Sequence, residues 1–287
     1  MSDAIQKKRM KYSVLMSVYD KEKPAYLRQS IESMLAQTVK PEQFIIVEDG
    51  PVSKELKQVI SGFTDRDPAL FTIIQKEHNE GLASALNTGI AAARNELVAR
   101  MDSDDISLPE RCEKELDAFE KDPSLDICGC QLGEFIHDDP DNVVLYRLVP
   151  TDDAAIKKFM HRRQPFNHPS VIYKKSAVLK YGGYEKLKRK EDFDLFSKML
   201  TGGCRARNVD EVLYLYRNDE NNYKRRKSWT NTSAALHVYW RHFRRGGCSF
   251  PDFLLISCAE LAFFILPLNL MKYLSDHLLR KADTVSQ

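Results

Sequence analysis

Residues 102 to 105 are the part of the chain whose types and spacing most clearly suggest chemistry. Asp102, Asp104 and Asp105 come shortly after the apolar run Leu97 to Ala99, which is typical of a buried strand end. Carboxylates this close repel one another unless a cation lies among them. Oxygen ligands suit a hard divalent ion, Mg²⁺ or Mn²⁺, and such an ion at a strand end could hold a diphosphate. The alternative is an acidic turn in which Asp105 or Ser107 caps the next helix.

The apolar pattern predicts a scaffold that would bring such strand ends together. Buried strands are expected at 12–18, 44–47, 70–74 and 97–101, and helical patterns follow each of them. This alternation predicts a Rossmann-like, mostly parallel sheet with helices on both faces. Ligands bind at the carboxyl ends of the strands in such sheets. We therefore expect the polar segments that follow strands to meet on one rim, namely 19–20, 48–50, 78–81 and 102–105.

The second half is less regular. Strands are expected at 127–132, 143–148, 171–173 and 211–216, and a helix at 192–200. The composition, 43% hydrophobic and 29% charged in 287 residues, is that of an ordinary globular protein. A net charge of +2 gives no reason to expect nucleic acid as a partner. None of the six cysteines forms a C-x-x-C pair, which predicts reduced thiols in a cytosolic protein. The polar, basic N-terminus is not expected to be a secretory signal.

The tail from residue 219 onward differs in character. Residues 219–247 hold seven Lys or Arg against two acids, and residues 253–271 are strongly apolar with Glu260 as the one charge. Glu260, Pro267 and Asn269 argue against a transmembrane helix. A basic segment followed by an apolar one favours a helix on an anionic membrane surface. The alternative is a helix that packs on the main domain or on a partner chain.

The order of motifs resembles the inverting family 2 glycosyltransferases with the GT-A fold. It is most similar to bacterial transferases that build O-antigens, capsules and exopolysaccharides. The resemblance covers residues 12 to 218, and each of its motifs is weak alone but specific in this order: Ser13 to Tyr19, Ile45 to Gly50, Asn79 to Asn87, Arg100 to Asp105, His168 to Ser170, Gly182 to Tyr184 and Glu191 to Leu195.

The resemblance implies a nucleotide-sugar site. Tyr19 would stack on uracil, while Glu48 and Asp49 would accept hydrogen bonds from the base or ribose; Glu48 departs from the aspartate more common in the family. The remaining donor-binding residues implied are Asn79, Gly81, Asn87, Arg100, Asp102, Ser103 and Asp104. Gly81 would allow close backbone approach, and Arg100 could meet a phosphate or pair with the carboxylates.

The same resemblance implies the catalytic groups. Asp102 and Asp104 match the family's D-x-D motif, and with Mn²⁺ or Mg²⁺ they would clamp the diphosphate. Asp192 is implied as the base that takes a proton from the attacking hydroxyl, with Glu191 as the alternative. The alternative is that Asp192 only caps the helix. His168 would line the acceptor pocket or be a structural histidine.

The resemblance therefore implies metal-dependent, inverting transfer of one hexose from a UDP-sugar to a hydroxyl of a glycan acceptor. The expected acceptor is linked to undecaprenyl diphosphate, at the cytoplasmic face of a bacterial inner membrane with which the protein associates peripherally. Residues 1–218 would form the catalytic domain (12–105 for the donor, 106–218 for the acceptor), and 219–287 a helical tail. The processive Gln-x-x-Arg-Trp motif is absent. The alternatives are a sugar-phosphate nucleotidyltransferase, whose basic glycine-rich loop is absent after the first strand, and a catalytically inactive binding module.

Overall fold

A computed structural model describes residues 9–218 and 228–266 of the chain. In this part of the chain, nine strands form one sheet in the order β3-β2-β1-β4-β8-β6-β9-β5, and β7 pairs with β6. The strands are β1 Tyr12–Val18, β2 Gln43–Glu48, β3 Phe71–Gln75, β4 Leu97–Met101, β5 Ile106–Ser107, β6 Leu125–Phe135, β7 Val143–Arg147, β8 Ile172–Lys174 and β9 Arg205–Arg217. The helices are α1 Pro24–Leu35, α2 Lys54–Thr64, α3 Leu82–Ala92, α4 Arg111–Lys121, α5 Asp153–Met160, α6 Lys175–Lys180, α7 Glu191–Thr201, α9 Trp229–Arg244 and α10 Phe250–Ile265.

The first four strands confirm the predicted parallel sheet. Strands β3, β2, β1 and β4 are neighbours in that order, and each adjacent pair is parallel. Their carboxyl ends therefore share one edge. The second half is mixed, because β8 is antiparallel to both β4 and β6 while β6 and β9 run parallel. The expectation of a mostly parallel sheet thus holds for the first half only.

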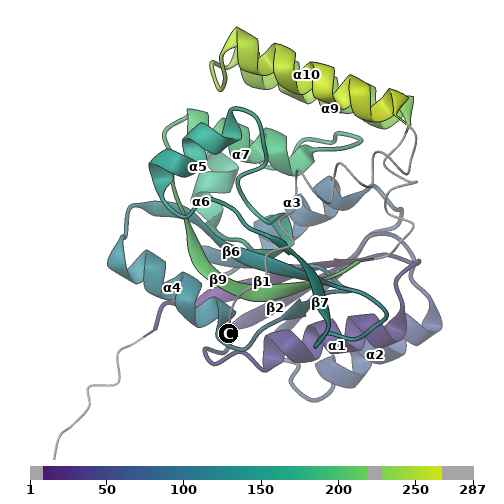
Figure 1. Cartoon of the computed structure of the whole chain (residues 1–287). Coiled ribbons are helices and arrows are strands. Elements are labelled where there is room, and N and C mark those ends of the chain that lie inside the picture. Colours follow the sequence, from purple (N-terminus) through teal and green to yellow (C-terminus); the bar gives the residue numbers. More distant parts are fainter. Residues whose placement is uncertain (1–8, 219–227, 267–287) are drawn as a thin grey trace, which may run out of the picture.

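Alternating side chains of the central strands fill a core on each face of the sheet. Val14 and Met16 of β1 pack with α1, α2 and α4, whereas Leu15 packs with α3, α5, α6 and α7. Figure 1 shows these two helical layers with the sheet between them. Helix α3 lies so close to β1 that a Cβ at Gly89 would collide with Leu15. The two-faced α/β arrangement predicted from the sequence is confirmed.

Helices α9 and α10 lie outside the layer that holds α7 (Figure 1). Ala235, Val238 and Tyr239 of α9 belong to the same buried cluster as α7. The buried Asp194 of α7 pairs at 2.7 Å with Arg245, the residue that directly follows α9. No helix among the described residues is long and apolar enough to cross a membrane. The basic run 224–227 and residues 267–271 lie outside the described residues.

Candidate active site

The acidic loop leaves the carboxyl end of β4, as the sequence predicts. One carboxylate oxygen from each of Asp102, Asp104 and Asp105 lies within 4.8 Å of the others. Asp102 also pairs with the buried Arg100 at 2.6 Å. Its main chain is held on both sides, since its carbonyl accepts from Ser30 Oγ at 2.6 Å and its N–H faces the Tyr214 hydroxyl at 3.2 Å. The loop is thus fixed with its carboxylates converging.

The electrostatics of the acidic loop fit a divalent cation. Burial, with the charges of Asp102 and Glu22, raises the pKa of Asp104 to about 7. Burial and the charge of Asp104 also raise the pKa of Asp105. The negative charges of these carboxylates destabilise one another, and a bound cation would relieve this repulsion. Mg²⁺ and Mn²⁺ prefer hard oxygen ligands of this kind. Ser103, the remaining predicted residue of this loop, donates a hydrogen bond to Glu22 at 2.6 Å.

Arg217 at the end of β9 forms hydrogen bonds to the acidic loop. Its Nε donates to the Asp104 carbonyl at 2.8 Å, and its other nitrogens donate to Asp138 and Gln29. The Arg217 N–H donates to the Asp105 carboxylate at 2.8 Å. Asp105 is therefore a buried acceptor for β9 rather than a helix cap.

The strand-end residues of β1 and β2 lie on the same edge. Tyr19 is 40% exposed, so it is not a core tyrosine. Glu48 is buried, and burial raises its pKa. Asp49 accepts from the N–H groups of Glu80 and Gly81 at 3.0 and 2.8 Å. Asp49 thereby joins β2 to the loop that opens α3.

The predicted donor residues of the α3 segment separate into two places. Asn79 is exposed, and Gly81 has a φ of 91°, which favours glycine. Asn87 lies within α3, where its amide donates to the Tyr184 carbonyl at 2.6 Å and accepts from the Tyr184 N–H at 2.8 Å. The side chain of Asn87 thus clamps the turn at Gly183. These two contacts join α3 to that turn.

The second carboxylate pair occupies the first turn of α7. Asp192 accepts from the Gln164 amide at 2.7 Å, and Glu191 lies beside it. Burial and the charge of Asp192 raise the pKa of Glu191. The residue before the helix, Lys190, has a left-handed φ of 60° and hydrogen-bonds to Tyr239 of α9 at 2.5 Å. The N-cap position of α7 is occupied by Lys190, so Asp192 is not the N-cap.

His168 lies close to this pair and is held by Tyr184. Its Nε2 and the Tyr184 hydroxyl are 2.8 Å apart. Burial holds the pKa of His168 well below its usual range, so the ring is neutral near pH 7. A neutral imidazole can contact a sugar hydroxyl but carries no charge for a phosphate.

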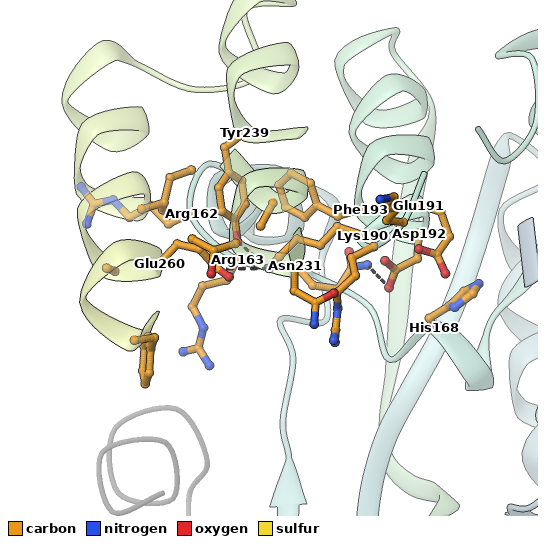
Figure 2. Close-up of a pocket in the computed structure, with 18 of the residues that line it drawn as sticks. Arg162, Arg163, His168, Lys190, Glu191, Asp192, Phe193, Asn231, Tyr239 and Glu260 are labelled. Carbon is orange, nitrogen blue, oxygen red and sulfur yellow. Dashed lines mark hydrogen bonds and ion pairs between the residues drawn. The ribbon is translucent and has the colours of Figure 1, made fainter. Parts of the chain in front are cut away.

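One cavity of 1090 Å³ connects the acidic loop with α7. Its lining includes Arg100, Asp102, His168, Glu191 and Asp192. Figure 2 shows His168 and Asp192 at one side of this cavity and Glu260 of α10 at the other. Asp104 and the β1 and β2 strand ends do not line it. The sequence prediction that the two acidic clusters share a site is consistent with this shared cavity.

Sequence reasoning missed three side chains that shape the site. Glu22 bonds Ser103, Gln164 bonds Asp192, and Tyr184 bonds His168. Tyr184 stands in the Gly-Gly-Tyr motif that supported the family resemblance, which is a usable signal. Glu22 and Gln164 meet their partners across 81 and 28 residues, and no local spacing marks them.

Comparison with known proteins points to one family. The model described as "Glycosyl transferase family 2" matches residues 13–187. An uncharacterized glycosyltransferase of Haemophilus influenzae is 36% identical over 95% of this chain and 100% of its own length. The amylovoran biosynthesis glycosyltransferase AmsE of Erwinia amylovora is 35% identical over 79% of this chain and 84% of its own. An Escherichia coli UDP-Gal:alpha-D-GlcNAc-diphosphoundecaprenol beta-1,3-galactosyltransferase is 32% identical over 94% and 97%.

Solved structures show the same fold at low sequence identity. The 1–349 fragment of S. aureus TarS in complex with UDP-GlcNAc superposes with a TM-score of 0.66 at 17% identity, over 94% of this chain and 76% of that chain. A Pyrobaculum calidifontis mannosyltransferase in complex with GDP-Man and Mn²⁺ gives 0.65 at 17%, over 92% and 72%. The fold is therefore GT-A. The family model covers the motifs that follow β1 and β2 and the acidic loop that follows β4. The chain therefore belongs to glycosyltransferase family 2 and is a glycosyltransferase with relatives in polysaccharide biosynthesis.

Proposed function

We propose that the protein transfers one hexose from a UDP-sugar, with inversion, to a hydroxyl of a lipid-linked glycan acceptor. The observation that carries the proposal is the single cavity lined by Asp102 of the acidic loop and by Asp192 of α7. A donor held at the first group and an acceptor hydroxyl at the second would meet inside it. Neither a nucleotidyltransferase nor an inactive module requires the second carboxylate.

The donor would bind along the carboxyl ends of β1, β2 and β4. Tyr19 would stack on uracil, and Glu48 and Asp49 would accept from the base or ribose. Asn79, Gly81 and Ser103 would follow the ribose and diphosphate, with Asn87 holding the neighbouring turn. Arg100 would add positive charge beside Asp102.

Asp104 and Asp102 would hold Mn²⁺ or Mg²⁺, because their oxygens converge and repel one another. The bound ion would neutralise charge that develops on the leaving UDP. Arg217 and Asp105 would keep the loop in place through their contacts with β9.

Asp192 would act as general base. Its carboxylate is oriented by the Gln164 amide and lies in the cavity where an acceptor hydroxyl could approach. Attack from that side, opposite UDP, would invert the anomeric carbon and give a β-linked product from an α-linked donor. Glu191 is the alternative base, and His168 would contact the acceptor sugar.

The acceptor and the location are proposed from the relatives and from the tail. The Escherichia coli relative is named for a diphosphoundecaprenol-linked acceptor, and we propose an undecaprenyl-diphosphate-linked acceptor here as well. Residues 12–105 would serve the donor, 106–218 the acceptor, and 219–287 the inner face of the bacterial cytoplasmic membrane. The exposed Phe250 and Leu254 of α10 support the membrane contact.

The direct test is a panel of UDP-sugars offered to the full-length protein with Mn²⁺, an extract of bacterial lipid-linked glycans and UDP release as the readout. We expect acceptor-dependent UDP release with one or two sugars, abolished by EDTA and restored by Mn²⁺. Full turnover in chelator would remove the metal from the proposal. Release of diphosphate from a nucleoside triphosphate and a sugar phosphate would instead indicate a nucleotidyltransferase.

A further inference from the structure

The cavity beside Asp192 extends along a wall that the transfer reaction itself does not use. Helix α10 contributes a series of apolar side chains to this wall, namely Leu255, Ile256, Ala259, Phe263 and Phe264. A nucleotide or a free sugar gains little from such a wall, whereas a hydrocarbon chain gains by leaving water. Leu254 and Ile265 of the same helix do not line the cavity and are exposed at the surface of the molecule.

Basic side chains line the same cavity. Arg162, Arg163, Lys188 and Arg189 come from the two loops that precede η1 (His168–Ser170) and α7. In Figure 2, Arg162 and Arg163 lie on the side of the cavity where Glu260 of α10 lies, and Asp192 of α7 lies on the other side. Arg162 is paired with Asp252.

Lys188 and Arg189 are the cations of this group available to a ligand. Within residues 9–218 and 228–266, neither side chain takes part in a hydrogen bond or an ion pair. They directly precede Lys190, Glu191 and Asp192 in the chain. The charge of Arg189 opposes the rise that burial and Asp192 cause in the pKa of Glu191, which places the guanidinium near the catalytic pair. Two cations that lack a partner in the described part of the chain, beside an apolar wall, fit a ligand with an anionic head and a hydrocarbon tail.

We propose that this part of the cavity binds a polyprenyl diphosphate, with Lys188 and Arg189 on the diphosphate and the α10 wall on the first isoprene units. The inference rests on the proposed function, because it makes this lipid the carrier of the acceptor sugar at Asp192. The UDP donor also carries a diphosphate. We assign the pair to the lipid because the α10 wall and the pair line the cavity together, whereas the donor diphosphate is assigned to the acidic loop.

The test is calorimetric titration of the full-length protein, with saturating UDP and Mn²⁺, by geranylgeranyl diphosphate below its micelle concentration. Geranylgeraniol and inorganic diphosphate are titrated separately. We expect geranylgeranyl diphosphate to bind at least about tenfold more tightly than either, because each lacks one half of the contacts. Equal affinity for geranylgeraniol, or for inorganic diphosphate, would overturn the proposal.

The double variant Lys188→Gln/Arg189→Gln should bind geranylgeranyl diphosphate at least about tenfold more weakly, since charged hydrogen bonds to phosphate are lost. UDP affinity should stay within about twofold. The matched control is Arg66→Gln/Lys121→Gln, which removes the same charge at two exposed positions, the turn after α2 and the end of α4, and should change neither affinity. Ala259→Glu places a charge in the α10 wall and should weaken the binding of geranylgeranyl diphosphate but not the binding of inorganic diphosphate.

Unchanged lipid affinity in the double variant would overturn the assignment, and an equal loss of UDP affinity would assign the pair to the donor instead. The proposed function fails separately. If the lipid binds as expected while no lipid-linked acceptor is glycosylated, the lipid site stands and the transfer reaction falls. If lipid-linked acceptors are glycosylated at the parental rate by the double variant, the reaction stands and this inference falls.

Discussion

At the scale of single residues, the partners of each carboxylate determine what it can do. Asp49 uses both oxygens on main-chain N–H groups, and Asp194 is bound by two arginines at the C-terminal end of α9. Asp192 differs, since among the described residues its one hydrogen bond comes from the Gln164 amide. A carboxylate with free lone pairs inside a cavity can still accept a proton. Asp192 is therefore the better candidate for the base.

Asp192→Asn keeps the shape of the side chain but cannot take a proton. A general base contributes about 10²–10⁴-fold, so turnover should fall at least about a hundredfold. The affinity for UDP-sugar and metal should stay near that of the parent. The measurement compares UDP release with calorimetric donor binding, and Glu191→Gln is the parallel variant. A normal rate in Asp192→Asn together with a dead Glu191→Gln would move the role to Glu191.

His168 should give the folded protein a measurable pH dependence. Because its folded pKa lies well below the unfolded value of about 6.5, the unfolded chain binds the extra proton, and stability is lost as pH falls below about 6.5. His168→Gln removes this titration. Between pH 7.5 and pH 5 the free energy of unfolding should fall in both proteins, and the fall should be smaller in His168→Gln than in the parent by about 1 to 2 kcal/mol. Urea unfolding at both pH values measures this, and parallel losses in the two proteins would refute it.

At the scale of elements, β9 places the acidic loop of β4. Arg217 reaches Asp104, Asp138 and Gln29 at once, and its N–H meets Asp105. The contacts with Asp104 and Asp105 join segments more than 100 residues apart in the chain. They explain how a loop of repelling carboxylates keeps one conformation.

Arg217→Lys keeps the charge but removes the planar fork that bonds three acceptors. Groups that orient metal ligands typically change metal affinity about 10- to 100-fold, and we expect a loss in this range for Mn²⁺ measured by titration in the presence of UDP. The control is Arg94→Lys, since Arg94 also bonds two carbonyls but lies away from the site. Equal Mn²⁺ affinity in Arg217→Lys and the parent would show that β9 does not hold the loop.

The elements also show what the sequence could predict. Strands β1, β2 and β4 and their helices follow from strong apolar periodicity, and the shared edge of parallel strands predicted that Asp49 and Asp102 lie on one rim. The two-residue strand β5 and the short helices α5 and α6 carry too little periodicity to be predicted. The hydrogen bonds of Asn87 and Arg217 connect them to partners 97 and 113 residues away in the chain, and no local sequence pattern predicts such contacts.

At the scale of the whole molecule, the C-terminal helices α9 and α10 expose several large apolar side chains. Ile256 of α10 is buried in the core cluster of α7, while Trp240, Phe250, Leu254 and Ile265 are exposed. Such a group of exposed apolar side chains marks an interaction surface, and the exposed Arg244, which lies 5.8 Å from the Trp240 ring, adds a positive charge to it. Helix α10, which also lines the cavity, would then contact a membrane.

We therefore expect the full-length protein to sediment with vesicles that contain anionic lipid, and high salt to weaken this only partly because apolar contacts are not screened. Phe250→Glu/Leu254→Glu should shift most of the protein to the supernatant. The matched control is Leu179→Glu, which alters an equally exposed apolar residue on α6. Sedimentation that is unaffected by the double variant, or equally affected by the control, would reject the α10 surface.

The anomeric configuration of the transferred sugar reports whether the two carboxylate groups act from opposite sides of the reacting carbon. With the leaving UDP at the acidic loop and the attacking hydroxyl at Asp192, one displacement would invert the anomeric carbon. An α-linked UDP-glucose-type or UDP-galactose-type donor should therefore give a β-linked product, with a large coupling between H1 and H2 in the proton NMR spectrum. An α-linked product would contradict the account, because it would require retention and a different arrangement of the reacting groups.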